Sequence, residues 1–242
     1  MAAFWTTIFY QPLFNLLVGI YNLVGDMGIA IVVLTIVLKV VLYPLSQKAV
    51  KSQRALQELQ PKVEALKLKL KDNKDGLAKG LMQLYQQEKV SPLSSCLPLL
   101  VQLPFLIALY QVFQSGLASA DSLKLLYPFI HNPGELSHIF LGFWDLLKPS
   151  WPLAVAAGAS QFWQTKMLMT TKPAVKIPGS KDEGQMAMMN KQMLYVMPVL
   201  TVVLGFKLPS GLIVYWLVNI LFTIGQQYLA FGKKDVPHSP VS

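Results

Sequence analysis

An apolar stretch from Gly28 to Leu45 contains a single charged residue, Lys39, and this combination restricts the folds open to the chain. The stretch is long enough to cross roughly 30 Å of hydrocarbon as a helix. A lysine near the middle of a bilayer costs about 2.5 to 3.5 kcal/mol on insertion scales, so it normally faces water or a partner. No other apolar segment contains an Asp or Glu that would neutralise it.

The composition indicates a membrane protein. The 242 residues are 53% hydrophobic and 14% charged, and a mean hydropathy of +0.45 is too high for one soluble core. We therefore predict an all-α polytopic membrane protein, because helices satisfy their own backbone hydrogen bonds in lipid. Five transmembrane helices are expected, at about residues 28–45, 95–115, 151–170, 193–208 and 212–230. Pro209, Ser210 and Gly211 predict a tight turn between the last two.

The basic residues fall on alternate loops. Ten lie in 46–92, five in 166–191 and two in the C-terminal tail 231–242, against two in 116–150 and one in the tight turn. Together with Lys39, these groups of 17 and 3 account for all 21 Lys and Arg residues. Positive residues collect on the cytoplasmic side, so the N-terminus is expected outside and the C-terminus in the cytoplasm.

Residues 1–25 carry no charge, and they lack the basic region and cleavage site of a signal peptide. A sixth span is one interpretation, because the segment is long enough. However, polar side chains recur at near-helical spacing, at Thr7, Gln11, Asn15 and Asn22. This pattern favours an external amphipathic helix that lies along the membrane interface.

Residues 46–92 have the pattern of a helical hairpin in water. Apolar side chains at positions 56, 59, 63, 66 and 70 follow the three-four spacing of a coiled-coil seam, and Pro61 should bend this arm. A turn at 71–76 and a second amphipathic stretch complete a cytoplasmic antiparallel hairpin. It is either a solvated charged loop or a docking arm for a partner, with candidate contacts at Arg54, Lys62, Lys67, Lys71 and Lys74.

The sequence does not predict an enzyme, a metal or a cofactor. Cys96 is the only cysteine, and its neighbours are apolar, so a buried structural thiol is expected. His131, His138 and His238 all lie outside the predicted spans. No base is available beside a nucleophile at membrane depth, and there is no glycine-rich phosphate loop with its lysine.

Uncharged polar residues recur at helical spacing inside the predicted spans. Thr35, Lys39 and Tyr43 follow an i, i+4, i+8 pattern that places them on one helix face. The other spans contribute Gln102, Gln161, Gln164, Tyr215, Asn219, Thr223, Gln226 and Gln227. These side chains are either hydrogen-bonding contacts between helices or the lining of a hydrated groove. The lysine itself either faces such a groove, open to the cytoplasm, or extends to the cytoplasmic surface.

Several motifs resemble the YidC/Oxa/Alb family of membrane-protein insertases. They are IVLKVVLYPLSQ, LQPKVEALKLKL, QLYQQEKVSPLSSCLPLLVQLPFLIALYQVF, MPV, LPSGLIVYW and QQYL, in the order and spacing of bacterial members. The resemblance is to a short form or to the conserved core. It implies a five-helix core with a hydrophilic groove in the bacterial cytoplasmic (inner) membrane. Expected partners are nascent membrane proteins, the lipid bilayer, translating ribosomes and the secretory translocon, with no specific nucleic-acid sequence.

The resemblance also assigns groove residues. The groove arginine of the family falls on Lys39, the polar residue one turn earlier on Thr35, and other contact positions fall on Pro98, Gln102, Pro104, Gln161, Tyr215, Trp216 and Asn219. A lysine keeps the positive charge but loses the planar fork of arginine. The alternatives are a small transporter or channel with Lys39 as its substrate or anion site, and a scaffold whose hairpin only recruits ribosomes.

Overall fold

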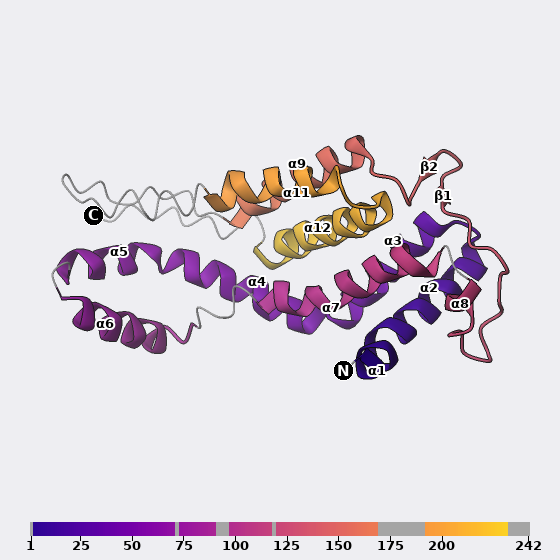
Figure 1. Cartoon of the computed structure of the whole chain (residues 1–242). Coiled ribbons are helices and arrows are strands. Elements are labelled where there is room, and N and C mark those ends of the chain that lie inside the picture. The colour runs from indigo at the N-terminus through magenta and orange to yellow at the C-terminus, as the bar shows by residue number, and fades with distance from the viewer. Residues whose placement is uncertain (1, 71–72, 91–96, 118–119, 169–191, 232–242) are drawn as a thin grey trace.

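The computed structural model describes residues 2–70, 73–90, 97–117, 120–168 and 192–231, and most of them are helical (Figure 1). The α-helices are α1 (Ala2–Trp5), α2 (Gln11–Val24), α3 (Met27–Val41), α4 (Tyr43–Glu58), α5 (Gln60–Lys69), α6 (Lys74–Gln87), α7 (Leu97–Gln111), α8 (Ala120–Leu123), α9 (Trp151–Leu168), α11 (Met197–Gly205) and α12 (Ser210–Phe231). Three π-helical turns join them, η1 (Thr6–Tyr10), η3 (Val112–Gly116) and η4 (Gln192–Val196). The predicted helical fold is therefore confirmed.

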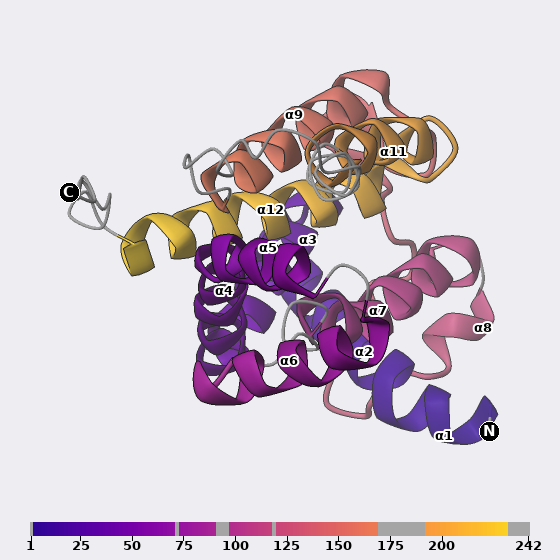
Figure 2. The same cartoon turned by 90° about the vertical axis from the view of Figure 1, so that its left-hand side faces the viewer.

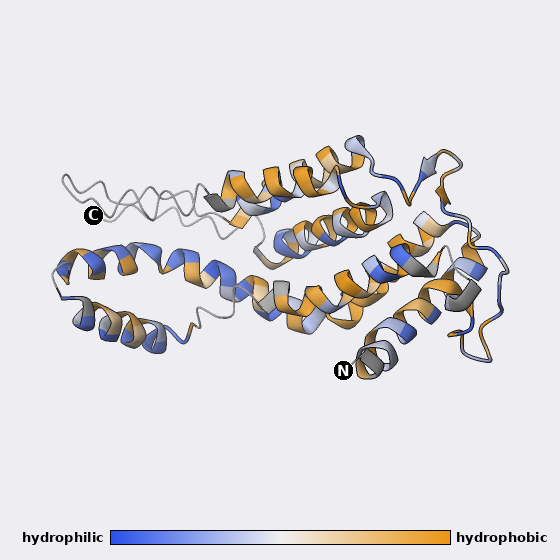
Figure 3. Cartoon of the chain, viewed as in Figure 1, coloured by the Kyte–Doolittle hydropathy of each residue, from blue (hydrophilic) through white to orange (hydrophobic). Residues whose placement is uncertain are grey.

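Helix α12 is central to the bundle, because it packs against α9 on one side and α3 on the other (Figures 1 and 2). Helix α11 packs on α9, and α2 packs on α3. The buried core joins α2, α3, α7, η3 and α12 through Phe14, Leu17, Met27, Ile31, Leu34, Leu109, Val112, Leu212 and Ile213. Figure 3 shows the apolar character of these helices and the hydrophilic character of α4 to α6.

Helices correspond to all five predicted spans, although several are short. Among the described residues, Thr6–Val24 and Ser210–Ala230 are long and apolar enough to cross a membrane, and α3 with α4 adds a third if that bent pair is one span. Leu100–Gln114 and Leu194–Gly205 are shorter apolar helices. The number of spans therefore stays a prediction, as does the interfacial position of residues 1–25.

The first predicted span does not continue as one helix to Leu45. Helix α3 ends at Val41, and α4 leaves it at an angle of 74°. Pro44 lies in the first turn of α4 and cannot donate a backbone hydrogen bond to the preceding turn, which favours a break at this point. The expected stripe from Thr35 through Lys39 to Tyr43 is therefore interrupted after Lys39.

The polar face of the N-terminal helix contacts a neighbouring loop. Asn15 Nδ2 donates to the Leu125 carbonyl at 3.0 Å, and Asn15 Oδ1 accepts from the Tyr127 amide at 2.6 Å. Further along the same helix, Asn22 Nδ2 donates to the His131 carbonyl at 2.7 Å. Of the four polar residues that indicated an amphipathic helix, Gln11, Asn15 and Asn22 thus bind backbone groups of residues 125–131.

A small β-hairpin follows this loop and was not predicted from the sequence. Strands β1 (Ile139–Phe140) and β2 (Trp144–Asp145) pair antiparallel, and each is two residues long. Asp26 connects the hairpin to α3, because one carboxylate oxygen caps the Ile29 amide at 3.0 Å and the other accepts from the Leu141 amide at 2.8 Å. Two-residue strands leave no recognisable alternation in a sequence.

Helices α5 and α6 lie side by side beyond the bundle (Figure 1). Helix α4 ends at Glu58, and Pro61 lies in the first turn of α5, so the arm breaks immediately before the proline. Asn73 caps α6 by accepting from the Gly76 amide at 2.8 Å. Lys62 on α5 forms an ion pair with Glu88, the C-cap residue of α6. The cytoplasmic location of these helices stays a prediction.

Candidate functional site

A set of polar side chains connects α3, α7 and α12, and we name it the polar seam: Lys39, Gln102, Tyr215, Asn219 and Thr223. Lys39 lies two residues before the end of α3 and is half-buried. Its amine donates a hydrogen bond of 3.1 Å to the hydroxyl oxygen of Thr223 on α12. The lysine side chain therefore reaches across to the neighbouring helix.

The hydrogen bonds continue along α12. The Thr223 hydroxyl donates to the Asn219 carbonyl at 2.8 Å, which leaves its oxygen free to accept from the lysine. Asn219 Nδ2 donates to Gln102 Oε1 on α7 at 2.6 Å, and Gln102 Nε2 donates to the Tyr215 hydroxyl. Successive members on α12 are four residues apart, so the seam extends about 12 Å along that helix at 1.5 Å per residue.

The charge of Lys39 has no carboxylate partner in the described part of the chain. The ion pairs there include Arg54 with Glu58, Lys62 with Glu88, and Asp145 with His138 and Lys148. The other seam residues are neutral dipoles, and they stabilise a positive charge without cancelling it. An amine in this setting attracts an incoming carboxylate more strongly than it would in bulk water, because the effective dielectric constant is lower.

A second polar contact lies next to the seam, where α12 meets α4. Ser46 and the Gln226 side chain exchange hydrogen bonds of 3.0 and 2.7 Å. The adjacent Gln227 is fully buried, and both its amide oxygen and its amide nitrogen lack a hydrogen-bond partner in the structure. Buried amides are normally satisfied, so this end of α12 carries unused hydrogen-bonding capacity.

The structure brings four of the predicted groove residues into the seam: Lys39, Gln102, Tyr215 and Asn219. Gln226 lies beside them through Ser46. Trp216 is half-buried on the turn of α12 that carries Tyr215. These residues come from three separate stretches of sequence, and their association agrees with the predicted stripe on α12.

Three other predicted residues lie elsewhere. Thr35 is buried and donates to the Ile31 carbonyl of its own helix at 2.6 Å. Tyr43 is exposed beyond the bend that follows α3. Gln161 lies between α9 and α11, where its side-chain oxygen accepts a hydrogen bond from Thr201. None of these contacts connects them to Lys39.

The predicted docking residues of the hairpin are distributed over three helices. Arg54 pairs with Glu58 one turn later at 2.9 Å, and Lys62 pairs with Glu88. Lys67 lies on α5, and Lys74 begins α6. Lys71 lies outside the described residues. The four described residues thus lie on α4, α5 and α6, and their role in docking stays a prediction.

Sequence reasoning missed two partners of the site. Thr223 belonged to the recognised stripe on α12, but its role as the acceptor for Lys39 required the packing of α3 on α12. Ser46 pairs with Gln226 across 180 positions, and a serine just after an apolar segment carries no signal of its own. Helical periodicity identified which residues share a face, but it did not predict which residues on other helices they contact.

The chain is similar to known proteins over most of its length. Residues 19–235 match the family model described as 60Kd inner membrane protein. The chain is 35% identical over 229 residues to "Membrane protein insertase YidC" of Pelobacter propionicus, covering 92% of this chain and 38% of that protein. It is 37% identical over 210 residues to the protein of the same name from Fusobacterium nucleatum, covering 87% of this chain and 88% of that protein.

A solved structure has the same fold. It is described as "Active YidC insertase crystal structure with the first transmembrane domain resolved", and it matches with a TM-score of 0.61 at 26% identity. The match covers 93% of this chain and 46% of that one. The chain thus spans less than half of this structure and of the Pelobacter relative, but most of the Fusobacterium relative. The chain belongs to the YidC family of membrane protein insertases.

Proposed function

We propose that this chain moves the hydrophilic ends of nascent membrane proteins through a polar groove open to the cytoplasm, and then releases their apolar helices into lipid. The polar seam would form one wall of that groove. The observation that carries the proposal is the amine of Lys39, which lies on a neutral hydrogen-bonded seam with no carboxylate partner among the described residues. A carboxylate on a substrate tail would supply the missing negative charge.

The contacts of Lys39 suit transient binding. Among the described residues, one hydrogen bond to a neutral hydroxyl holds the amine, and a carboxylate forms a stronger, charge-assisted bond with the same group. Lysine binds as a point charge and imposes no forked geometry, so one site accepts carboxylates in many orientations. Such tolerance is suited to clients that differ in sequence.

The insertion step requires no nucleotide in this proposal. Burial of the substrate's apolar helix in the bilayer releases free energy. For acidic tails that move outward, the membrane potential adds about 2.3 kcal/mol per charge per 100 mV. The chain would lower the free-energy barrier for moving the hydrophilic tail across the membrane, and it would carry out no covalent chemistry.

The proposed topology completes the mechanism. We place α3, α7, α9, α11 with η4, and α12 across the membrane, with the N-terminus outside and the C-terminus in the cytoplasm, because basic residues predominate in the loops of one side. Helices α4 to α6 would then stand in the cytoplasm as a docking arm. We propose nascent chains, translating ribosomes and the secretory translocon as partners of that arm.

Reconstitution into vesicles tests the proposed function. The substrate is a short single-spanning protein with an acidic N-terminal tail, added without nucleotide, and protease protection of the tail measures insertion. We expect insertion by the wild type and by Lys39→Arg, and a severalfold loss in Lys39→Ala. Lys124→Ala is the matched control, because Lys124 is an exposed lysine outside the polar seam. Equal insertion by the wild type and Lys39→Ala would contradict the proposed role of the charge.

A further inference from the structure

The turn between β1 and β2 presents apolar side chains in a backbone geometry that normally selects other residues. Leu141 has a φ of 52° and Gly142 a φ of 80°, both in the left-handed region. That region suits Gly, Asn and Asp, whereas a leucine there is strained. The Leu141 side chain is nevertheless 53% exposed, and Phe143 is 68% exposed. The fold holds two apolar side chains outward at a tip where polar residues are usual.

The turn is fixed in place by several contacts. The Leu141 amide donates to Asp26 Oδ2, and the Phe143 amide donates to the Phe140 carbonyl at 3.2 Å. The Phe140 ring lies directly against Gly28, where an added Cβ would meet the ring at 2.0 Å. The Phe143 ring packs on Trp144 with centroids 4.6 Å apart. The outward direction of Leu141 and Phe143 is therefore a property of the folded chain.

The same contacts set the level of the turn relative to the bundle. Asp26 caps the start of α3, so the turn lies where α3 begins. The carbonyls of Leu146 and Lys148, which follow β2, accept from the first backbone amides of α12, those of Gly211 and Ser210. The β-hairpin therefore lies across the beginnings of α3 and α12, at the end of the bundle shown at the right of Figure 1.

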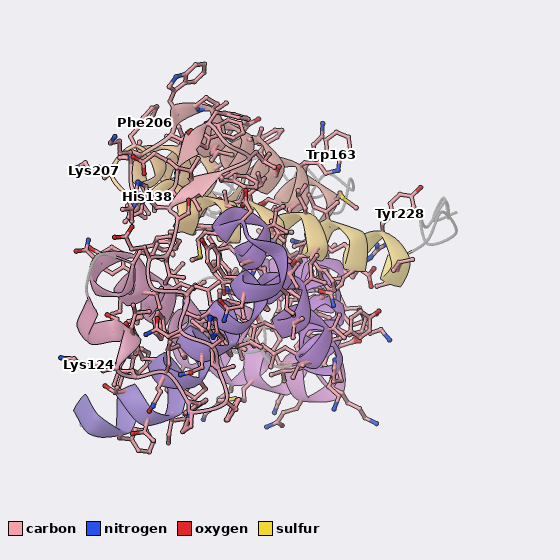
Figure 4. All side chains as sticks on the ribbon, turned by 90° about the vertical axis from the view of Figure 1, so that its right-hand side faces the viewer. Lys124, His138, Trp163, Phe206, Lys207 and Tyr228 are labelled. Atoms are coloured by element: carbon pink, nitrogen blue, oxygen red, sulfur yellow. The ribbon has the colours of Figure 1, made fainter. Side chains whose placement is uncertain are left out.

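Exposed aromatic side chains mark both ends of the bundle. Trp151 at the start of α9 and Phe206 at the end of α11 are exposed at the level of the turn, and Figure 4 labels Phe206 with Lys207 and His138 at one edge of this end. Trp163 and Tyr228, near the opposite ends of α9 and α12, project away from the bundle (Figure 4). Aromatic side chains gather at the two interfaces of a membrane. The turn lies at one of these two levels.

We propose that the Leu141–Phe143 turn is a lipid anchor that enters the bilayer leaflet at which α3 and α12 begin. Its apolar side chains would lie at the boundary between headgroups and acyl chains, where their burial compensates the strained backbone of Leu141. The exposed amines of Lys148 and Lys207 would extend from the same region toward lipid phosphates. Lipid is the occupant because the turn lies at the end of the bundle where the apolar side chains of Trp151 and Phe206 are also exposed.

Site-directed spin labelling tests the anchor in the full chain. Cys96, the only cysteine, is replaced by serine, and single cysteines are labelled at Leu141 or Phe143. Leu200 on the exposed face of α11 is the lipid-facing reference, and the exposed loop residue Asn132 is the aqueous reference. The labelled proteins are reconstituted into vesicles of phosphatidylethanolamine and phosphatidylglycerol. Collision rates with oxygen and with a water-soluble nickel chelate are then measured.

We expect the oxygen-to-nickel ratio at Leu141 and Phe143 to exceed that at Asn132 severalfold and to approach that at Leu200. A ratio equal to that at Asn132 would place the turn in water and overturn the proposal. Low collision rates with both reagents would show that protein covers the turn, and would also overturn it. If Leu141→Cys fails to fold, the label at Phe143 decides the question alone, because Phe143 does not have a positive φ. The measurement does not depend on insertion activity.

Discussion

The amine of Lys39 on α3 lies 3.1 Å from the hydroxyl oxygen of Thr223 on α12, although the two residues are 184 positions apart in the sequence. The hydroxyl hydrogen of Thr223 points to the Asn219 carbonyl, so the threonine presents its oxygen to the lysine. Thr223 therefore fixes where the one charge of α3 is held. It also links that charge to the amide groups of Asn219 and Gln102.

Replacement of Thr223 tests whether the position of the charge matters. Thr223→Val keeps the shape and removes the acceptor, so the amine loses its fixed position. We expect insertion of an acidic-tailed substrate to fall severalfold, while a neutral-tailed substrate is inserted as by the wild type. Thr223→Ser retains the hydroxyl and should behave as the wild type. Equal losses for both tails in Thr223→Val would indicate a packing defect and contradict a role in holding the charge.

Sequence patterns predicted the members of the seam better than its geometry. The spacing of Tyr215, Asn219 and Thr223 identified one face of α12, because helical periodicity is a local property. The bend after Val41 was not predicted, since the segment from Gly28 to Leu45 was interpreted as one apolar span although Pro44 disfavours a continuous helix there. Helical periodicity therefore predicted that Tyr43 continues the polar face of Thr35 and Lys39, whereas in the structure Tyr43 lies beyond the bend.

The choice of partner could not be predicted where a polar residue has two neighbouring helices. Gln161 was assigned to the groove, and the structure pairs it with Thr201 on α11. Nothing in the sequence around Gln161 states whether that face of α9 meets α11 or α12, because α9 packs extensively on both. Tertiary packing decides such contacts, and the packing of helices cannot be predicted from the residue pattern of a single sequence.

The Gln161–Thr201 hydrogen bond should contribute to stability and not to substrate charge preference. We expect Gln161→Leu and Thr201→Val to show a coupling of about 0.6 kcal/mol in a double-mutant cycle, the average for hydrogen bonds between membrane helices. Reversible unfolding in mixed detergent and dodecyl sulfate measures the four variants. A coupling near zero, or a loss confined to acidic substrates, would contradict a purely structural role.

Gly28 should tolerate no side chain, because an added Cβ would lie 2.0 Å from the Phe140 ring. We expect Gly28→Ala to destabilise the fold by about 1 to 3 kcal/mol, the range for overpacked cores. Gly225→Ala is the matched control, since no heavy atom lies within 4 Å of a Cβ added there, and alanine favours helix formation. Chemical unfolding in detergent compares the two variants. Similar midpoints for Gly28→Ala and the wild type would show that the β-hairpin can shift away from α3.

The β-hairpin should also make stability depend on pH. Partial burial alone would raise the pKa of Asp145, but the hydrogen bonds from Lys148 and the Leu147 amide, together with the charges of Lys148 and His138, lower that pKa below its usual value of 3.8. Because the pKa is lower in the folded state, this contribution to stability is complete above the unfolded-state pKa of about 3.9 and is lost as pH falls through the folded-state value.

Thermal unfolding between pH 3 and pH 7 tests this dependence. We expect the wild type to be more stable than Asp145→Asn near neutral pH, and the difference to shrink as pH falls below about 4, because the carboxylate of the unfolded chain is protonated first and that of the folded protein follows at lower pH. Lys148→Ala should reduce the pH dependence, because it removes the 2.9 Å ion pair with Asp145. A constant difference between the wild type and Asp145→Asn over the whole range would mean that the side chain acts through packing alone, and that its charge does not contribute to stability.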